Sequence, residues 1–250
     1  MTNRVLVEIA VDSVTGAQAA ANGGADRIEL CADLAAGGLT PSLGLLETVK
    51  RTVELPVHAM LRPRAGNFLY DDGEWQTILA DLEALAAAGA DGFVFGSLHP
   101  DGTIDEGRTR ALCQAAGPLP RTFHRAFDHS ADAAAALETL IDLGIERVLT
   151  SGQQRTAPRG KACLAGLVEQ ARDRIVVMAG AGIRDDNVVD LVQQTRIPEV
   201  HLSAGASRPG GMQHWPADVP MGRDDEPDDQ VRVTDEAMVS RVVKALRAQG

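Results

Sequence analysis

The feature that most constrains the fold is an eightfold alternation between short β-branched apolar runs and longer Ala- and Leu-rich stretches. The apolar runs, read as strands, lie at residues 4–10, 27–31, 57–62, 92–96, 121–128, 147–150, 175–179 and 199–203. Three joins share one signature, in which a glycine (Gly24, Gly89 or Gly144) is followed by Ala-Asp or Ile-Glu and then a strand. A glycine that ends a helix before a short turn is typical of a repeated βα unit. Eight such units predict a closed (β/α)8 TIM-type barrel of parallel strands.

The stretches between the runs predict helices at residues 13–22, 42–52, 74–88, 106–116, 131–143, 162–171, 186–194 and 237–249. Residues 213–233 break the alternation, and their charged run at 223–229 predicts a solvated loop. The last helix is then the eighth barrel helix, displaced by an extended loop. We therefore expect a single domain over 1–250, with a barrel core at about 4–206 and a polar loop and C-terminal helix at 207–250.

The amino-acid composition limits which classes of binding partner and which compartment are expected. The formal net charge of -11 provides no excess basic field for nucleic acid or an anionic membrane. Neither a signal sequence nor a long apolar segment is evident, which predicts a soluble protein. The three cysteines, Cys31, Cys113 and Cys163, show no CxxC spacing and predict a reducing compartment, the cytoplasm.

Polar side chains recur inside the apolar runs at alternating positions. Glu8 lies in the first run, Glu29 and Cys31 lie in the second, and His201 and Ser203 lie in the eighth. Successive strand side chains point to opposite faces, so these residues share the face away from the helices. Chemistry in TIM barrels takes place at the C-terminal ends of the strands. We expect these residues to meet at one mouth, although each buried charge could instead form a structural ion pair.

The run at 121–128 is unusually polar for a buried strand. Alternation directs His124 and Asp128 to one face and Arg125 and Phe127 to the other, so Arg125 reaches the mouth only if a twist or bulge turns it inward. Buried polar groups without partners cost about 1–3 kcal/mol each, which means that they must be paired or used. The candidate catalytic residues for acid/base or metal-assisted chemistry are Glu8, Glu29, His124 and Asp128.

Glycine turns after the seventh and eighth runs indicate an anion site. The turns 180–182 and 203–207 would place backbone N–H groups near helix N-termini, where TIM barrels often bind phosphate. Turn geometry alone also explains glycines at such places. The candidate substrate- or anion-binding residues are Arg62, Arg64, Arg125, Ser151, Gly152, Gly180, Gly182, His201, Ser203 and Gly205.

Two reaction classes are disfavoured. The three lysines, Lys50, Lys161 and Lys244, lie outside the predicted strands, whereas a Schiff-base aldolase needs a lysine at a strand end. The first turn also lacks the GxGxxG pattern of dinucleotide-binding folds.

Several blocks together resemble the CutC family. They are residues 7–9, 24–31, 37–42, 56–58, 62–64, 122–128, 147–152, 178–182, 199–201 and 203–205. The resemblance implies a cytoplasmic (β/α)8 barrel, often a homo-oligomer such as a dimer or tetramer, with a role in copper homeostasis and copper binding.

The resemblance also implies one metal ligand, Cys31. A second cysteine can occur in the family two residues after the strand-one glutamate, where this chain has Ala10. Since Cu(I) selects sulfur ligands, this difference argues against a two-thiolate site. A free cysteine is also often a small buried apolar residue.

Three alternatives stay open beside copper binding. One is an enzyme that acts on a small phosphorylated or carboxylated metabolite through Glu8 or Glu29 with His124. Another is a sugar isomerase or epimerase that uses a divalent metal on Glu29, His124 and Asp128. The last is a ligand-binding barrel without turnover.

Overall fold

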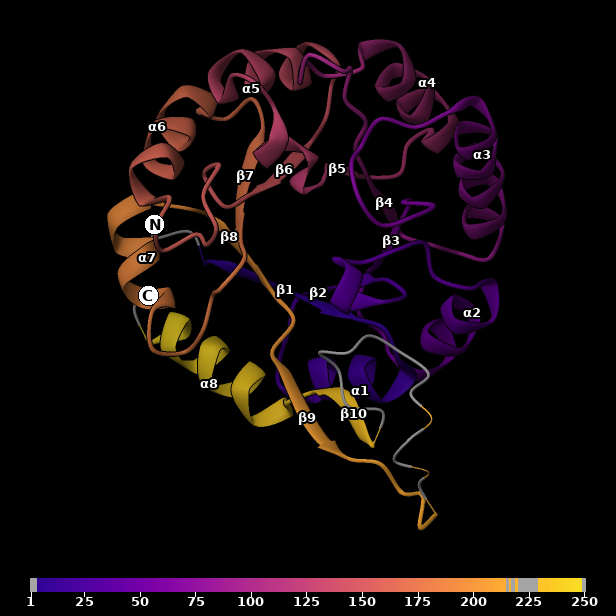
Figure 1. The fold of residues 1–250 in the computed structure, drawn as a ribbon. Coiled ribbons are helices and arrows are strands. Elements are labelled where there is room, and N and C mark those ends of the chain that lie inside the picture. Colours follow the sequence, from indigo (N-terminus) through magenta and orange to yellow (C-terminus); the bar gives the residue numbers. More distant parts are fainter. Residues whose placement is uncertain (1–3, 215, 217–218, 220–228, 249–250) are drawn as a thin grey trace.

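A computed structural model describes residues 4–214, 216, 219 and 229–248. Its main sheet is a closed barrel of eight parallel strands in sequence order, in which the eighth strand pairs with the first (Figure 1). The barrel strands are β1 (Leu6–Val11), β2 (Arg27–Leu30), β3 (Val57–Met60), β4 (Gly92–Phe95), β5 (Arg121–Phe123), β6 (Arg147–Thr150), β7 (Val176–Gly180) and β8 (Glu199–Leu202). The predicted TIM-barrel fold is confirmed.

Helices surround the strands (Figure 1). They are α1 (Val14–Asn22), α2 (Leu43–Thr52), α3 (Asp72–Ala87), α4 (Glu106–Ala116), α5 (Ala133–Asp142), α6 (Lys161–Ala171), α7 (Val188–Thr195) and α8 (Glu236–Arg247), with short 3-10 helices η1 (Leu34–Ala36) and η2 (Arg125–His129). Side chains from Ser13, Ser42 and Asp71 cap their helices as sequence capping rules predict. The last helix, α8, packs against both α7 and α1, the place of an eighth barrel helix.

Alternation along the strands separates the main apolar core outside the barrel from an interior that carries polar groups beside a small apolar cluster of Cys31, Met60 and Val94. On β1, Val7, Ile9 and Val11 are almost fully buried and belong to the main apolar core, whereas Glu8 and Ala10 take the other face. Burying one large apolar side chain contributes about 1.5–3 kcal/mol. The packing between strands and helices therefore holds the barrel together, and its interior can carry polar groups.

The predicted strand at 121–128 is wrong beyond Phe123. The Ala126 N–H donates to Nδ1 of His124 at 3.2 Å, and the Phe127 N–H donates to the His124 carbonyl, so the chain turns into η2. Local side-chain bonds of this kind compete with a sheet ladder. His124 and Asp128 therefore do not share a strand face.

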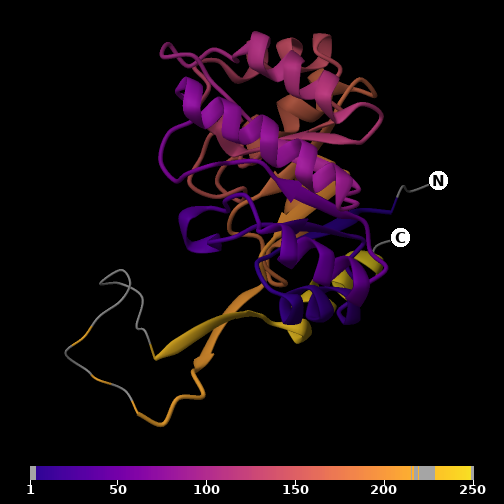
Figure 2. The ribbon, with the colours of Figure 1, turned by 90° about the vertical axis from the view of Figure 1, so that its right-hand side faces the viewer.

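The predicted loop at 213–233 is wrong in part. Residues 230–233 belong to β10 (Gln230–Thr234), which pairs antiparallel with β9 (Gly205–Pro209). This arm, β9 and β10, projects away from the barrel (Figure 2). The turn predicted after the eighth strand is also wrong, because Gly205 begins β9 and does not lead into a helix N-terminus. Of the solvated run predicted at 223–229, residues 223–228 lie outside the described residues.

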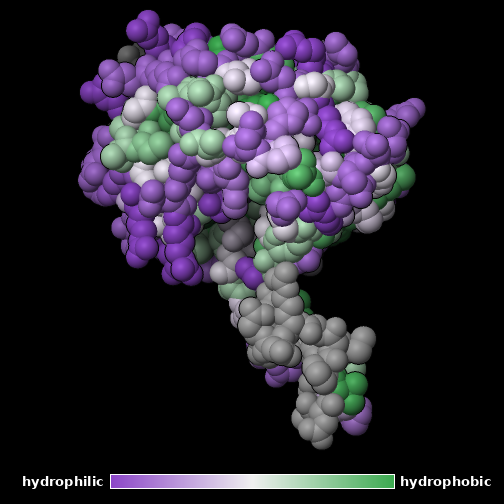
Figure 3. Space-filling model, turned by 45° about the horizontal axis from the view of Figure 1, so that its top comes forward, coloured by the Kyte–Doolittle hydropathy of each residue, from purple (hydrophilic) through white to green (hydrophobic). Residues whose placement is uncertain are grey.

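Figure 3 shows a largely hydrophilic face on the barrel, with scattered apolar patches. In the described part of the chain, no helix is long and apolar enough to cross a membrane.

Candidate functional site

The layer nearest the N-terminal ends of the strands is a buried ionic network. Arg27 on β2 donates to Glu8 and, at 2.7 Å, to Glu199 at the start of β8. Arg147 on β6 donates to both oxygens of Glu199, at 2.5 and 3.1 Å, and its Nη1 donates to Thr122 at 3.4 Å. Arg27 and Glu199 are less than a tenth exposed. This paired layer, Arg27, Glu199 and Arg147, ties together strands on opposite sides of the barrel.

Above the paired layer, His201 stands between two buried carboxylates. Its Nδ1 lies 2.8 Å from Glu8 Oε1, and its Nε2 lies 3.7 Å from Glu29 Oε2. One ligand atom from each of Glu8, Glu29 and His201 falls within 4.8 Å of the other two. The Cys31 thiol donates to Glu29 Oε2 at 3.4 Å, while Glu29 Oε1 has no hydrogen-bond partner within the described residues.

The protonation states in this cluster depend on burial and on neighbouring charge. Burial alone would raise the pKa of Glu8, but Arg27 and His201 more than offset it and hold that pKa low. Burial raises the pKa of Glu29 above its ordinary value. For His201, burial alone would lower the pKa, yet the charges of Glu29 and Glu8 raise it. Burial and the Glu29 charge raise the pKa of the Cys31 thiol well above its ordinary value, so it is protonated at neutral pH.

These residues fit a metal ion. If Glu8 accepts the Nδ1–H of His201, the free Nε2 is aimed toward Glu29, as in a carboxylate–histidine–metal arrangement. The unpaired Glu29 Oε1 would supply a carboxylate ligand. Cys31 lies 3.4 Å from Glu29 Oε2 but outside the group of ligand atoms within 4.8 Å, so it would supply a soft ligand only after it loses its proton and shifts toward His201. Imidazole with carboxylate suits copper, zinc and iron, and a thiol shifts the preference toward copper and zinc.

The mouth above this cluster contains two adjoining cavities of 240 and 480 Å3. Both are lined by Glu29, Gly37, Arg125 and His201. The smaller one is further lined by Arg62, Phe68, His124 and His129, and the larger one by Ala10, Gly182, Ser203 and Gly205. The candidate metal cluster therefore lies at the shared floor of an open mouth.

His124 occupies a tightly defined position in the smaller cavity. It is 3% exposed, and its ring lies 5.0 Å from that of Phe68. A Cβ at Gly96 would come within 2.5 Å of His124 Nδ1, so only glycine leaves room for the imidazole. Burial, followed by the charge of Arg62, lowers the pKa of His124 to about 3, and the ring is neutral at physiological pH.

Arg62 is held by backbone carbonyls. Its Nη1 donates to Ala36 at 2.8 Å and Gly38 at 3.1 Å, and its Nη2 donates to Gly66 at 3.0 Å. The guanidinium lies 5.2 Å from the centre of the Phe68 ring. Arg62 therefore orders the loops of the mouth and contributes positive charge, with most of its donors already used.

Asp128 positions its neighbours. Its carboxylate accepts from Arg125 Nε at 2.7 Å, from Thr150 Oγ1 at 2.6 Å, and from the backbone N–H groups of Ser151 and Gln153. These bonds occupy its acceptor sites and turn Arg125 inward over the mouth. The inward reach of Arg125 thus comes from η2 and not from a strand bulge.

The remaining candidates divide into two groups. Gly182, Ser203 and Gly205 line the larger cavity. Arg64, Ser151, Gly152 and Gly180 line neither cavity. Arg64 pairs with Glu74, and a Cβ at Gly180 would clash with Leu149.

Sequence reasoning missed the paired layer and two wall residues, Phe68 and His129. A signal for the former was present, because Arg27 alternates with Glu29 and Cys31 on one strand face. Phe68 and His129 lie in irregular segments, where no periodicity indicates which way a side chain points.

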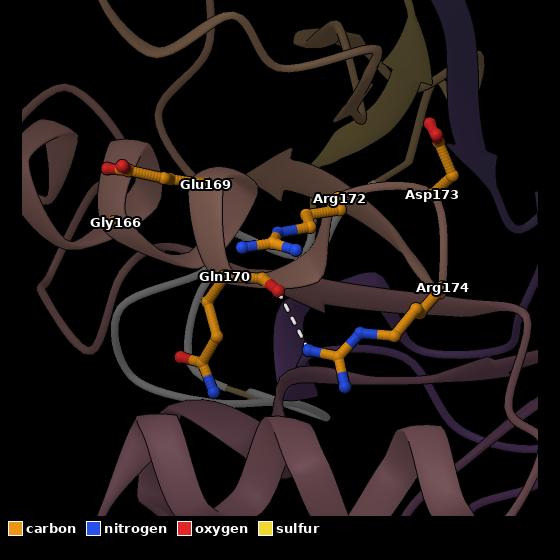
Figure 4. Close-up of a pocket in the computed structure, with 6 residues that line it drawn as sticks. All are labelled: Gly166, Glu169, Gln170, Arg172, Asp173 and Arg174. Atoms are coloured by element: carbon orange, nitrogen blue, oxygen red, sulfur yellow. Dashed lines mark hydrogen bonds between the residues drawn. The ribbon is translucent and has the colours of Figure 1, made fainter.

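Another hollow lies at the end of α6 (Figure 4). It measures 870 Å3, and its six lining residues (Gly166, Glu169, Gln170, Arg172, Asp173 and Arg174) are exposed or half-buried. Arg174 is already bound to the Gln170 carbonyl at 2.8 Å and to Glu138. This hollow precedes β7, at the barrel end opposite the mouth, and we assign it no chemistry.

Comparison with known proteins decides the family. A sequence model of the CutC family matches residues 5–206. The chain belongs to the CutC family. It is 49% identical over 220 residues to the human copper homeostasis protein cutC homolog, covering 88% of this chain and 81% of the human protein. A CutC family protein from Vibrio vulnificus is 44% identical over 97% of this chain and 98% of its own length.

A solved CutC structure from Streptococcus agalactiae superimposes with a TM-score of 0.76 at 30% identity, covering 80% of this chain and 98% of that one. The family match begins at β1 and ends within β9, so it spans the barrel and the metal cluster. Most of the arm, and α8, lie beyond it.

Proposed function

We propose that this CutC family chain acts in copper homeostasis by binding a copper ion at Glu29, His201 and Cys31, with Glu8 holding the imidazole. The names of the relatives point to copper. The observation that carries the proposal is the buried Glu29 Oε1, which lacks a partner in the described chain although Oε2 of the same carboxylate lies beside an imidazole and a thiol. Such an atom costs about 1–3 kcal/mol unless something binds it.

The donor set predicts moderate affinity for Cu(I). It contains one sulfur, and Cu(I) prefers thiolate and thioether ligands. The neighbouring β1 position that faces inward is Ala10, which is paired in register with Glu29. A cysteine at that position would bring a second sulfur to the cluster.

Copper titration under reducing, anaerobic conditions against a chromophoric Cu(I) chelator tests the proposal. We expect stoichiometric uptake by the native chain, a loss of at least tenfold in affinity for Cys31→Ala, and a gain for Ala10→Cys. Cys113→Ala is the matched control, because Cys113 is also buried but lies on α4. Uptake that is equal in the native and Cys31→Ala proteins would exclude Cys31 as a ligand.

We further propose that the chain forms a homo-oligomer through the arm. Three of the five large apolar side chains exposed in the described residues, Met212, Val219 and Val231, lie between the start of β9 and the end of β10. An isolated two-stranded hairpin is marginal in water, which favours cover by a second copy. Light scattering should show a dimer or tetramer that Val231→Asp shifts to monomer. Leu43→Asp, on α2, is the control, and an unchanged mass for Val231→Asp would contradict the proposal.

A cytoplasmic location is supported by three free cysteines, which suit a reducing compartment. Fractionation of cells that express the tagged chain would test it.

A further inference from the structure

We propose that the smaller mouth cavity binds a small metabolite bearing a carboxylate or phosphate, one oxygen of which accepts a hydrogen bond from His124 Nε2. This binding function goes beyond copper, and it rests on His124, Arg125 and the cavity between them. It does not require a metal on Glu29 and His201.

The backbone determines which ring nitrogen of His124 carries the proton. Nδ1 accepts from the Ala126 N–H at 3.2 Å, so the proton of the neutral ring is on Nε2. That Nε2–H has no acceptor among the residues described, and the residue is 97% buried and lines the cavity. A donor kept dry without an acceptor costs about 1–3 kcal/mol, and a ligand oxygen in the cavity would remove that cost.

The charge of the wall selects an anion. Arg125 and Arg62 line the cavity, against one carboxylate, Glu29. Asp128 binds Nε of Arg125, and Ser151 accepts from Nη2 at 3.1 Å, so the guanidinium is fixed with its remaining edge available. Arg62 bonds only backbone carbonyls, so its positive charge has no carboxylate partner among the described residues and favours a small anion in a chain of net charge -11.

The cavity volume limits the ligand. At 240 Å3 it has room for about eight waters at roughly 30 Å3 each, which corresponds to a molecule of a few carbons. Phe68 closes one wall with a flat apolar face against His124. The floor is Glu29 and His201, where a hydroxyl on the ligand could donate to the unpaired Glu29 Oε1.

His58 supplies the internal comparison. It too is a buried imidazole above a glycine, since a Cβ at Gly92 would lie 2.7 Å from its ring, and its Nδ1 also lacks a partner within the described chain. Burial lowers its pKa to about 4. His58 lines neither mouth cavity. The two imidazoles are therefore equally buried and equally unpaired, and they differ in that only His124 belongs to the wall of a mouth cavity.

Calorimetric titration of metal-free full-length protein at pH 7.5 tests the proposal, with sodium phosphate, acetate and glycolate as probes and sodium chloride at equal ionic strength as the blank. We expect at least one oxyanion to bind with an affinity that His124→Leu weakens tenfold or more. His124→Gln keeps an N–H donor and should regain part of the affinity, while His58→Leu and Cys113→Ala should bind like the native chain. Phosphate binding without acetate or glycolate binding would assign a phosphate ligand, and the reverse a carboxylate.

A second measurement does not depend on the folding of any variant. In 15N-labelled native protein, the ligand should shift the His124 Nε2–H resonance and leave the His58 ring signals in place. The proposal is overturned if none of the three oxyanions moves that resonance, or if His58→Leu and His124→Leu weaken binding equally.

Discussion

The barrel interior holds two polar layers that differ in how their charges are satisfied. In the paired layer, Arg27, Glu199 and Arg147 compensate one another through short hydrogen bonds. In the layer above it, Glu29 Oε1 and His124 Nε2 are equally buried but have no partner in the described chain. The polar groups of both layers are buried, so the layers differ in whether those groups have hydrogen-bond partners. Paired charges stabilise this one fold, whereas unpaired groups at the open end are available to a ligand.

The largest expected effect comes from breaking the paired layer. Arg27→Met leaves Glu8 and part of Glu199 buried without their cation, and removal of one partner of a buried pair costs about 3–5 kcal/mol. Urea unfolding at pH 7.5 should show that loss. Arg174→Met, which breaks an exposed pair with Glu138, should cost far less, because solvent screens exposed charges. Equal costs for the two variants would refute the distinction between paired interior and surface charges.

A smaller effect is expected from pH at the upper layer. His124 has a folded-state pKa of about 3, below its ordinary 6.5, so the unfolded chain binds its proton first as the pH falls. The contribution of neutral His124 to the free energy of unfolding is complete above pH 6.5 and is lost progressively between pH 6.5 and 3. About 1.4 kcal/mol of that contribution is lost between pH 7.5 and 5.5.

His124→Gln removes that titration. The difference in unfolding free energy between pH 7.5 and 5.5 should therefore be about 1.4 kcal/mol smaller in the variant than in the native chain. Comparing the two proteins cancels the opposite shift of His201, whose raised pKa adds stability at low pH. Parallel pH profiles for both proteins would count against a buried neutral His124.

The smallest expected change in stability is at Glu29. Burial raises its pKa and so disfavours the charged form in the folded chain, which means that the uncharged Glu29→Gln should not lower the unfolding free energy at pH 7.5. The same variant should lose copper uptake, measured as for Cys31→Ala. A variant destabilised as much as Arg27→Met would place Glu29 with the paired layer.

Much of the barrel could be predicted from sequence because its signals are local. Alternation of apolar and polar residues located β1, β2 and β8, and it placed Glu8, Glu29 and His201 on inward faces. β6 and α4 have the predicted bounds. The candidate site was harder, because its members come from strands far apart in sequence and their pairing depends on register.

The clearest failure shows why. Asp128 looked like a partner for His124 at strand spacing, but its carboxylate is bound by Thr150 and Ser151 on the next βα unit, and that contact helps end β5 early. The arm was also missed because its pairing joins segments that are distant in sequence: a long polar segment separates β9 from β10, its antiparallel partner.

The sequence by itself determined the barrel class, the inward face of most strands and the family, because period-two alternation, helix caps and short motifs act over a few residues. Only the tertiary structure decided which buried charges are paired and which are left open. That outcome depends on side-chain positions across the barrel interior: Arg27 reaches Glu199, whereas Glu29 and His124 belong to the wall of the mouth, and their Oε1 and Nε2 atoms reach no partner in the described chain.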